Sequence, residues 1–107
     1  MLKMIETLLD DGVLIFEEDL KTIEARLKQN PDMITDIIKV HGFATRNKDI
    51  IISEYIYPSR TGLVYELATF DVEDAMHLCI AIDKLSIRSK NLTVGVAYPK
   101  EEIDEDD

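Results

Sequence analysis

The stretch from Asp49 to Ile82 constrains the fold most, because strand-like, turn-like and helix-like patterns follow one another in it without a gap. Residues 49–57 are rich in β-branched and aromatic side chains, residues 58–62 (PSRTG) are mainly turn formers, and residues 63–70 resume the strand-like composition. This order predicts a β-hairpin with a five-residue loop. Asp71 stands where a helix N-cap belongs, so a helix should follow it.

The first half of the chain carries helical periodicity. Apolar residues at helical spacing predict helices over Met1–Leu9 and Glu17–Gln29. A third helix should open at Pro31 and close at His41–Gly42, with Gly42 in the left-handed conformation of a helix terminus. Residues 13–16 (VLIF) stay ambiguous, since four consecutive apolar residues fit either a buried strand or the opening of the next helix.

The alternating run from Leu92 to Tyr98 predicts a last strand. The helix after Asp71 leads into it and could extend to about Ser89. A strand, a helix and a strand form a crossover unit, so the last strand should lie parallel to the second strand of the hairpin. The fold class that follows is α+β, with N-terminal helices packed on a small mixed sheet in one domain over residues 1–99. A strand at 13–16 would give a ferredoxin-like order instead, but four residues are few for it.

Charge is the most unusual property of the composition. The 107 residues include 22 Asp and Glu against 12 Lys and Arg, a formal net charge of −10, and residues 100–107 alone hold six acids and one lysine. Affinity for nucleic acid depends largely on Lys and Arg, so the charge disfavours direct binding to nucleic acid and to acidic membranes. The acidic tail at 100–107 is expected to be either a disordered, solubilising terminus or a peptide that docks on a basic partner.

No residue pattern predicts a catalytic, metal or cofactor site. Asp74, His77 and Cys79 are close in sequence, but His77 and Cys79 point in different directions on a helix and no second His or Cys cluster completes a zinc shell. Cys79 is expected to pack as a small buried hydrophobe. His41 is explained by its place at a helix end. The helix after Asp71 should turn these residues inward: Val72, Ala75, Met76, Cys79, Ile80 and Ile82.

The hairpin is the better candidate for a contact surface, because both faces of its strands carry apolar or aromatic residues. Tyrosine and arginine are enriched at interface hot spots. The partner-binding residues we predict lie in the hairpin and in the tail: Tyr55, Tyr57, Arg60, Tyr65, Glu101, Glu102, Asp104 and Glu105. The surface also predicts a homodimer through the Asp49–Tyr57 strand.

The function we expect is that of a small non-enzymatic interaction protein, an adaptor, inhibitor or assembly factor that binds a protein partner through its acidic surface and the hairpin. One form of this hypothesis is a basic partner that itself binds nucleic acid. The alternative is a small enzyme or ligand-binding domain with a pocket between sheet and helices. The single cysteine and the absence of an apolar signal or membrane segment predict a cytoplasmic protein.

Overall fold

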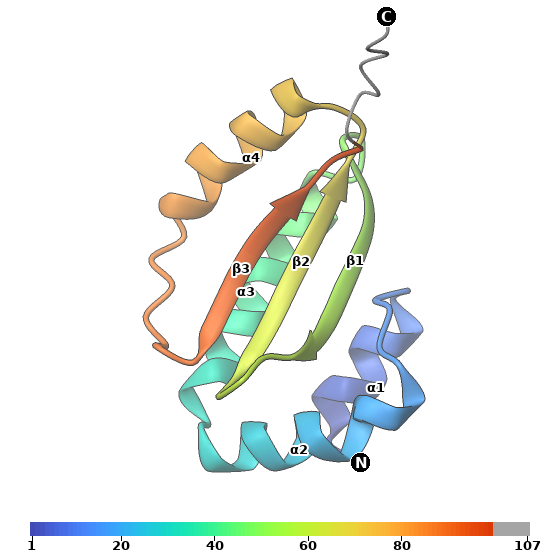
Figure 1. Ribbon diagram of the computed structural model, residues 1–107, viewed down its shortest axis with the longest axis vertical. Helices are drawn as coiled ribbons and strands as arrows, with labels where there is room; N and C mark the ends of the chain where they lie inside the picture. The colour runs from blue at the N-terminus through green and yellow to red at the C-terminus, as the bar shows by residue number, and fades with distance from the viewer. Residues whose placement is uncertain (100–107) are drawn as a thin grey trace, which may run out of the picture.

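The computed structural model describes residues 1–99 and consists of a three-stranded sheet with its helices packed toward one face (Figure 1). The elements in chain order are α1 (Lys3–Asp10), the 3₁₀ turn η1 (Glu17–Asp19), α2 (Leu20–Gln29), α3 (Asp32–Arg46), β1 (Ile51–Pro58), β2 (Leu63–Thr69), α4 (Val72–Asp83) and β3 (Leu92–Ala97). No helix in this part of the chain combines the length and apolarity needed to cross a membrane. The α+β prediction is confirmed, and the predictions for the acidic tail lie outside the described residues.

β2 is the central strand of the sheet. It pairs antiparallel with β1 and parallel with β3, so the predicted hairpin and the crossover through α4 are both confirmed. The predicted five-residue loop was wrong: Pro58 belongs to β1 and pairs with Leu63, so the loop is residues 59–62. Alternate residues of β2 separate the two faces of the sheet. Its buried residues Leu63, Tyr65, Leu67 and Thr69 point toward the helices, whereas Val64, Glu66 and Ala68 point to a face that no described helix covers.

The core lies between the sheet and the helices. β2 contributes Leu63, Tyr65 and Leu67, and α3 contributes Met33, Ile37 and Val40, all at most 1% exposed. Side chains of α1, α2 and α4 join the same cluster, namely Ile5, Leu8, Ile23, Leu27 and Leu78. Each fully buried side chain of this size contributes about 1.5–3 kcal/mol. The core therefore ties every helix to one face of the sheet.

The outer edge of β1 is occupied at its centre. Leu14 forms a parallel bridge with Tyr55: its N–H donates to the carbonyl of Glu54 (2.8 Å) and its carbonyl accepts from the N–H of Ile56 (3.1 Å). Residues 13–16 are thus neither a full strand nor the opening of a helix. The ferredoxin-like order needs a complete strand at this place, and residues 1–99 do not form one.

α3 runs past the predicted end. Gly42 lies inside the helix, which continues to Arg46, so the prediction that His41–Gly42 closes it was wrong. A glycine inside a helix costs about 1 kcal/mol relative to alanine. Burial of Phe43 and Ala44 in the next turn offsets that cost, because both residues belong to the core.

α4 begins where it was predicted to begin, but it ends before Ser89, the furthest end that the sequence allowed. The Asp71 carboxylate accepts the N–H of Asp74 (2.9 Å), which confirms the N-cap. The helix stops at Asp83. The buried carboxylate of Asp36, on α3, accepts the N–H groups of Arg88 (3.1 Å) and Ser89 (2.7 Å), so these groups are not available to helical carbonyls.

The prediction of which α4 residues face the core was partly wrong. Only Ala75 and Leu78 are buried, whereas Val72, Met76, Cys79 and Ile80 are exposed. The predictions that these four residues turn inward and that Cys79 packs as a buried hydrophobe were therefore wrong. Successive apolar residues lie on two sides of α4, and the sheet covers one side only.

Two loops meet at the end of the sheet where β2 and β3 begin. The Arg26 guanidinium donates to the carbonyls of Ser59 and Gly62, and the N–H of Leu63 donates to the carbonyl of Asn91 (2.9 Å). A Cβ atom on Gly62 would lie 1.8 Å from the Asn91 carbonyl oxygen, so only glycine fits there. These contacts fix the position of the hairpin loop.

Candidate functional site

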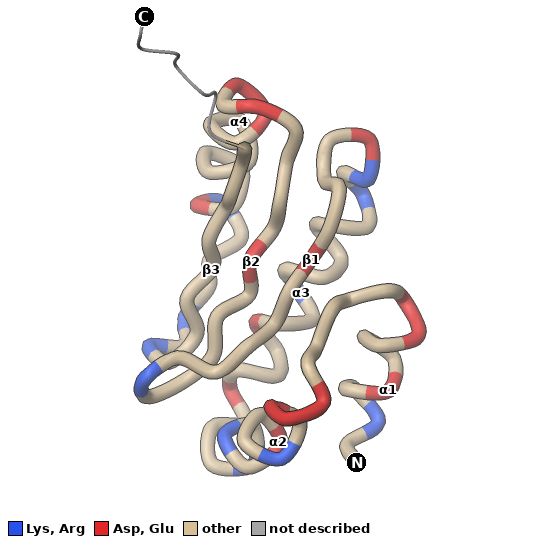
Figure 2. Tube along the Cα trace, turned by 45° about the vertical axis from the view of Figure 1, so that its right-hand side comes forward, with Lys and Arg blue, Asp and Glu red and all other residues tan. Residues whose placement is uncertain are grey.

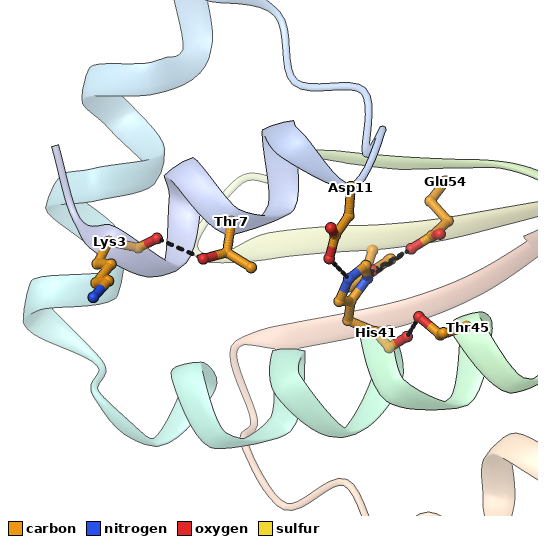
Figure 3. A network of polar contacts seen from close by, with 7 residues as sticks. Lys3, Thr7, Asp11, His41, Thr45 and Glu54 are labelled. Atoms are coloured by element: carbon orange, nitrogen blue, oxygen red, sulfur yellow. Dashed lines mark hydrogen bonds and ion pairs between the residues drawn. The ribbon is translucent and has the colours of Figure 1, made fainter.

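A polar cluster joins four separate parts of the fold (Figure 3). His41, on α3, has its Nε2 2.8 Å from the Asp11 carboxylate and its Nδ1 3.2 Å from the Glu54 carboxylate and 3.1 Å from the Tyr65 hydroxyl. The Tyr65 hydroxyl in turn donates to Glu54. The cluster connects the turn after α1 with α3, β1 and β2.

The electrostatics of the cluster favour a charged imidazole. Burial lowers the pKa of His41, but hydrogen bonds and charges from Asp11 and Glu54 outweigh this effect and leave the pKa raised above its ordinary value of 6.5. Burial and the Glu54 carboxylate both raise the pKa of Tyr65, whose side chain is completely buried. Tyr65 is therefore a neutral hydrogen-bond donor at any physiological pH.

This arrangement suits a structural role better than catalysis. Both nitrogens of His41 are engaged, and a general base needs a nitrogen aimed at a substrate. The Tyr65 hydroxyl is likewise engaged by Glu54 and His41. Within residues 1–99 no group of three or more His, Cys, Asp and Glu side chains has the arrangement of a metal site.

The face of the sheet without helices carries a different cluster, formed by Tyr55, Tyr57 and Glu66. Glu66 lies directly opposite Tyr55 in the register of β1 and β2, and the Tyr57 hydroxyl donates to its carboxylate (3.2 Å). All three side chains are half-buried. Burial, followed by the charge and the hydrogen bond of Glu66, raises the pKa of Tyr57. We call Tyr55, Tyr57 and Glu66 the tyrosine–glutamate cluster.

The predicted partner-binding residues of the hairpin do not share one surface. Tyr55 and Tyr57 lie on the helix-free face, and Arg60 is exposed at the hairpin loop. Tyr65 points to the opposite side, where it is buried against α3. The four predicted acids of the tail, between Glu101 and Glu105, lie outside the described residues.

A second surface lies beside α4 and β3. A hollow of about 340 Å³ runs between the helix and the strand, lined by Val72, Ala75, Met76, Cys79, Ile80, Val96 and Tyr98. Another of about 290 Å³ lies next to the 84–91 segment. The first is at the small end of the range for ligand pockets, about 300–1,000 Å³, and the second lies just below that range. Five of the ten exposed large apolar side chains of residues 1–99 belong to this region, namely Phe70, Val72, Met76, Ile80 and Tyr98.

Charged residues gather at the two ends of the sheet (Figure 2). Asp71, Glu73 and Asp74 start α4 at the end where β2 and β3 finish. Arg60, Arg88 and Lys90 lie in the two loops at the other end, where β2 and β3 begin, and their side chains are exposed. None of these six residues takes part in an ion pair within the described chain.

No family model, curated protein or solved structure matched this chain. Sequence reasoning missed the polar cluster around His41, because its four residues lie far apart in the sequence and share no motif. It also missed Glu66, which lies opposite Tyr55 and accepts a hydrogen bond from Tyr57. The five-residue loop that the sequence predicts would place Tyr55 opposite Tyr65. In the structure Pro58 pairs with Leu63, which shifts the register by one residue and brings Glu66 opposite Tyr55.

Proposed function

We propose that this protein is a non-enzymatic interaction protein that binds a basic protein partner through the helix-free face of its sheet. The observation that supports this proposal is the tyrosine–glutamate cluster: a carboxylate opposite Tyr55 and hydrogen-bonded to Tyr57, on a face of the sheet that no described helix covers. Tyrosine is enriched at interface hot spots, and charge at such a site selects the partner.

The chemistry of the cluster suits an arginine or lysine side chain. A guanidinium group above Tyr55 would interact with the ring face and could form a hydrogen-bonded pair with the Glu66 carboxylate. A cation–π contact contributes about 0.5–1 kcal/mol at an exposed site and more where water is excluded. The net charge of −10 should also speed the approach of a cationic partner.

We propose that the protein acts in a reducing compartment such as the cytosol. Cys79 is exposed and the chain has no other cysteine to pair with it. Thiols of this kind persist where glutathione and thioredoxin keep them reduced.

An arginine-rich peptide tests the site directly. We would titrate it into isotope-labelled protein and follow the backbone amide signals, first at low salt and then at about 0.5 M salt. Signals of β1 and β2 around Tyr55 and Glu66 should shift at low salt and recover at high salt, because screening weakens ion pairs.

Two matched variants make the test specific. Glu66→Gln removes the carboxylate of the cluster and should weaken peptide binding several-fold. Glu18→Gln removes one equally negative charge from an exposed position on η1 and should have little effect. Equal weakening by both variants would show that only net charge matters, and no shifts on β1 or β2 would contradict the proposed surface.

Capture from a lysate of the source cells would then identify the partner. Immobilised wild-type protein should retain a basic protein that Glu66→Gln retains poorly. Retention of the same proteins by both would count against the proposal.

A further inference from the structure

We infer that a second copy of this chain pairs with the free edge of β3, so that two three-stranded sheets join into one sheet of six strands. Within residues 1–99, β3 pairs with β2 on one side only. Its sequence, Leu92–Ala97 (LTVGVA), contains no charged residue and no proline. Natural edge strands are usually protected by lysine, proline or a bulge, and an edge without them is ready to pair.

The apolar face of α4 lies beside this edge. Val72, Met76 and Ile80 follow each other at intervals of four along the exposed side of the helix, and the hollow next to them is lined by Val96 of β3. Figure 1 shows α4 displaced beyond β3, away from β2. A strand added next to β3 would therefore lie close to the apolar face that the sheet of one copy leaves exposed.

The charges favour a second copy over an unrelated strand. A two-fold axis makes the β3 strands antiparallel, so the end of β3 in one copy lies beside the start of β3 in the other. The acidic start of α4 (Asp71, Glu73 and Asp74) lies at the first of these ends, and the basic loops (Arg60, Arg88 and Lys90) lie at the second. The acidic end of each copy would face the basic end of the other, so the dimer would contain this pairing twice.

The other edge of the sheet is less suitable. The sequence predicts a homodimer through the Asp49–Tyr57 strand, but Leu14 already occupies the centre of the β1 edge with two hydrogen bonds. Pairing through β3 also leaves the helix-free faces of both copies on one side of the joined sheet. The dimer would then present two tyrosine–glutamate clusters to a partner.

Sedimentation equilibrium at physiological salt, over a range of protein concentrations, tests the inference. The wild-type protein should approach twice its chain mass of 12.2 kDa. Thr93→Lys places a lysine on the exposed side of β3, and Ile80→Glu places a carboxylate on the apolar face of α4. Each change enters the interface twice, so each should raise the dissociation constant of the dimer about tenfold or more.

Both variants have close controls. Thr22→Lys makes the same change at an exposed position of α2, and Ile38→Glu makes the same change on α3, where the isoleucine is 59% exposed against 62% for Ile80. Circular dichroism and thermal unfolding would confirm that all four variants fold. A wild-type protein that stays monomeric at every concentration, or a dimer equally sensitive to test and control variants, would overturn the inference.

A charge exchange tests the antiparallel arrangement independently. One variant carries Glu73→Lys with Asp74→Lys, and a second carries Arg88→Glu with Lys90→Glu. Each alone places like charges opposite each other and should be mainly monomeric. A mixture of the two should form a heterodimer, because the basic ends of the first variant then face the acidic ends of the second. No association in the mixture would refute this arrangement.

Discussion

The His41 cluster makes a prediction about stability and pH. His41→Gln replaces a side chain that can be charged by one that is neutral at every pH. The folded-state pKa of His41 is raised above the unfolded value of about 6.5, so the folded state binds the proton more tightly than the unfolded state does. The stabilisation from His41 should therefore be complete below pH 6.5 and should be lost as the pH rises through the folded-state pKa.

The magnitude follows from the contacts of His41. Hydrogen bonds that involve a charged group contribute about 1.5–3 kcal/mol each when buried. His41 is 16% exposed and so is Glu54, but Asp11 is 51% exposed, so its contact contributes less than the contact with Glu54. Glutamine can still donate one hydrogen bond. We therefore expect His41→Gln to cost about 2 kcal/mol at pH 5.5, a decrease in Tm of about 10 °C for a domain close to this size.

Urea unfolding between pH 5.5 and 8.5 measures the effect. The difference in free energy of unfolding between wild type and His41→Gln should be largest at pH 5.5 and should shrink as the pH rises. His77→Gln is the matched control. His77 is exposed on α4, and its side chain forms no hydrogen bond with residues 1–99. A difference for His41→Gln that stays constant or grows with pH would refute the reasoning.

Three further predictions concern local structure. Gly62→Ala should cost about 3 kcal/mol in chemical unfolding, because the new Cβ collides with the Asn91 carbonyl, whereas Gly95→Ala, with nothing within 4 Å, should cost less than about 1 kcal/mol. Asp71→Ala removes the N-cap of α4 and should lower the free energy of unfolding by about 1 kcal/mol. Deleting residues 100–107 should leave the unfolding midpoint unchanged, since six acids in eight residues have little apolar surface to bury; a large loss would show that the tail is packed.

The sequence predicted those features whose signals are local. The hairpin, the N-cap at Asp71 and the parallel last strand each depend on a few neighbouring residues or on a chirality rule that holds for most folds. The length of α3 was not predictable in the same way. Gly42 resembles a helix stop, and only the burial of Phe43 and Ala44 against distant elements continues the helix beyond it.

The candidate site was harder to predict because it depends on register and packing. Tyr55 and Tyr57 were predicted as contact residues, and the structure places both on the helix-free face, while Tyr65 lies on the opposite side of the sheet. Both faces of the hairpin strands carry apolar residues, so their sequence does not indicate which face the helices cover. The pairing of Glu66 with Tyr55 also depends on the register, which the predicted loop length places one residue off.

The orientation of α4 was also predicted wrongly, and the composition of the helix explains why. Ala75 and Leu78 contact the core, while Val72, Met76 and Ile80 point away from it, so the helix is apolar on both sides. A helix that packs on a single sheet normally has one apolar side and one polar side, and the polar side reveals its orientation. The second apolar side stays exposed within residues 1–99, and an exposed patch of this kind usually marks an interface. The feature that misled the sequence prediction is thus the one that points to a dimer.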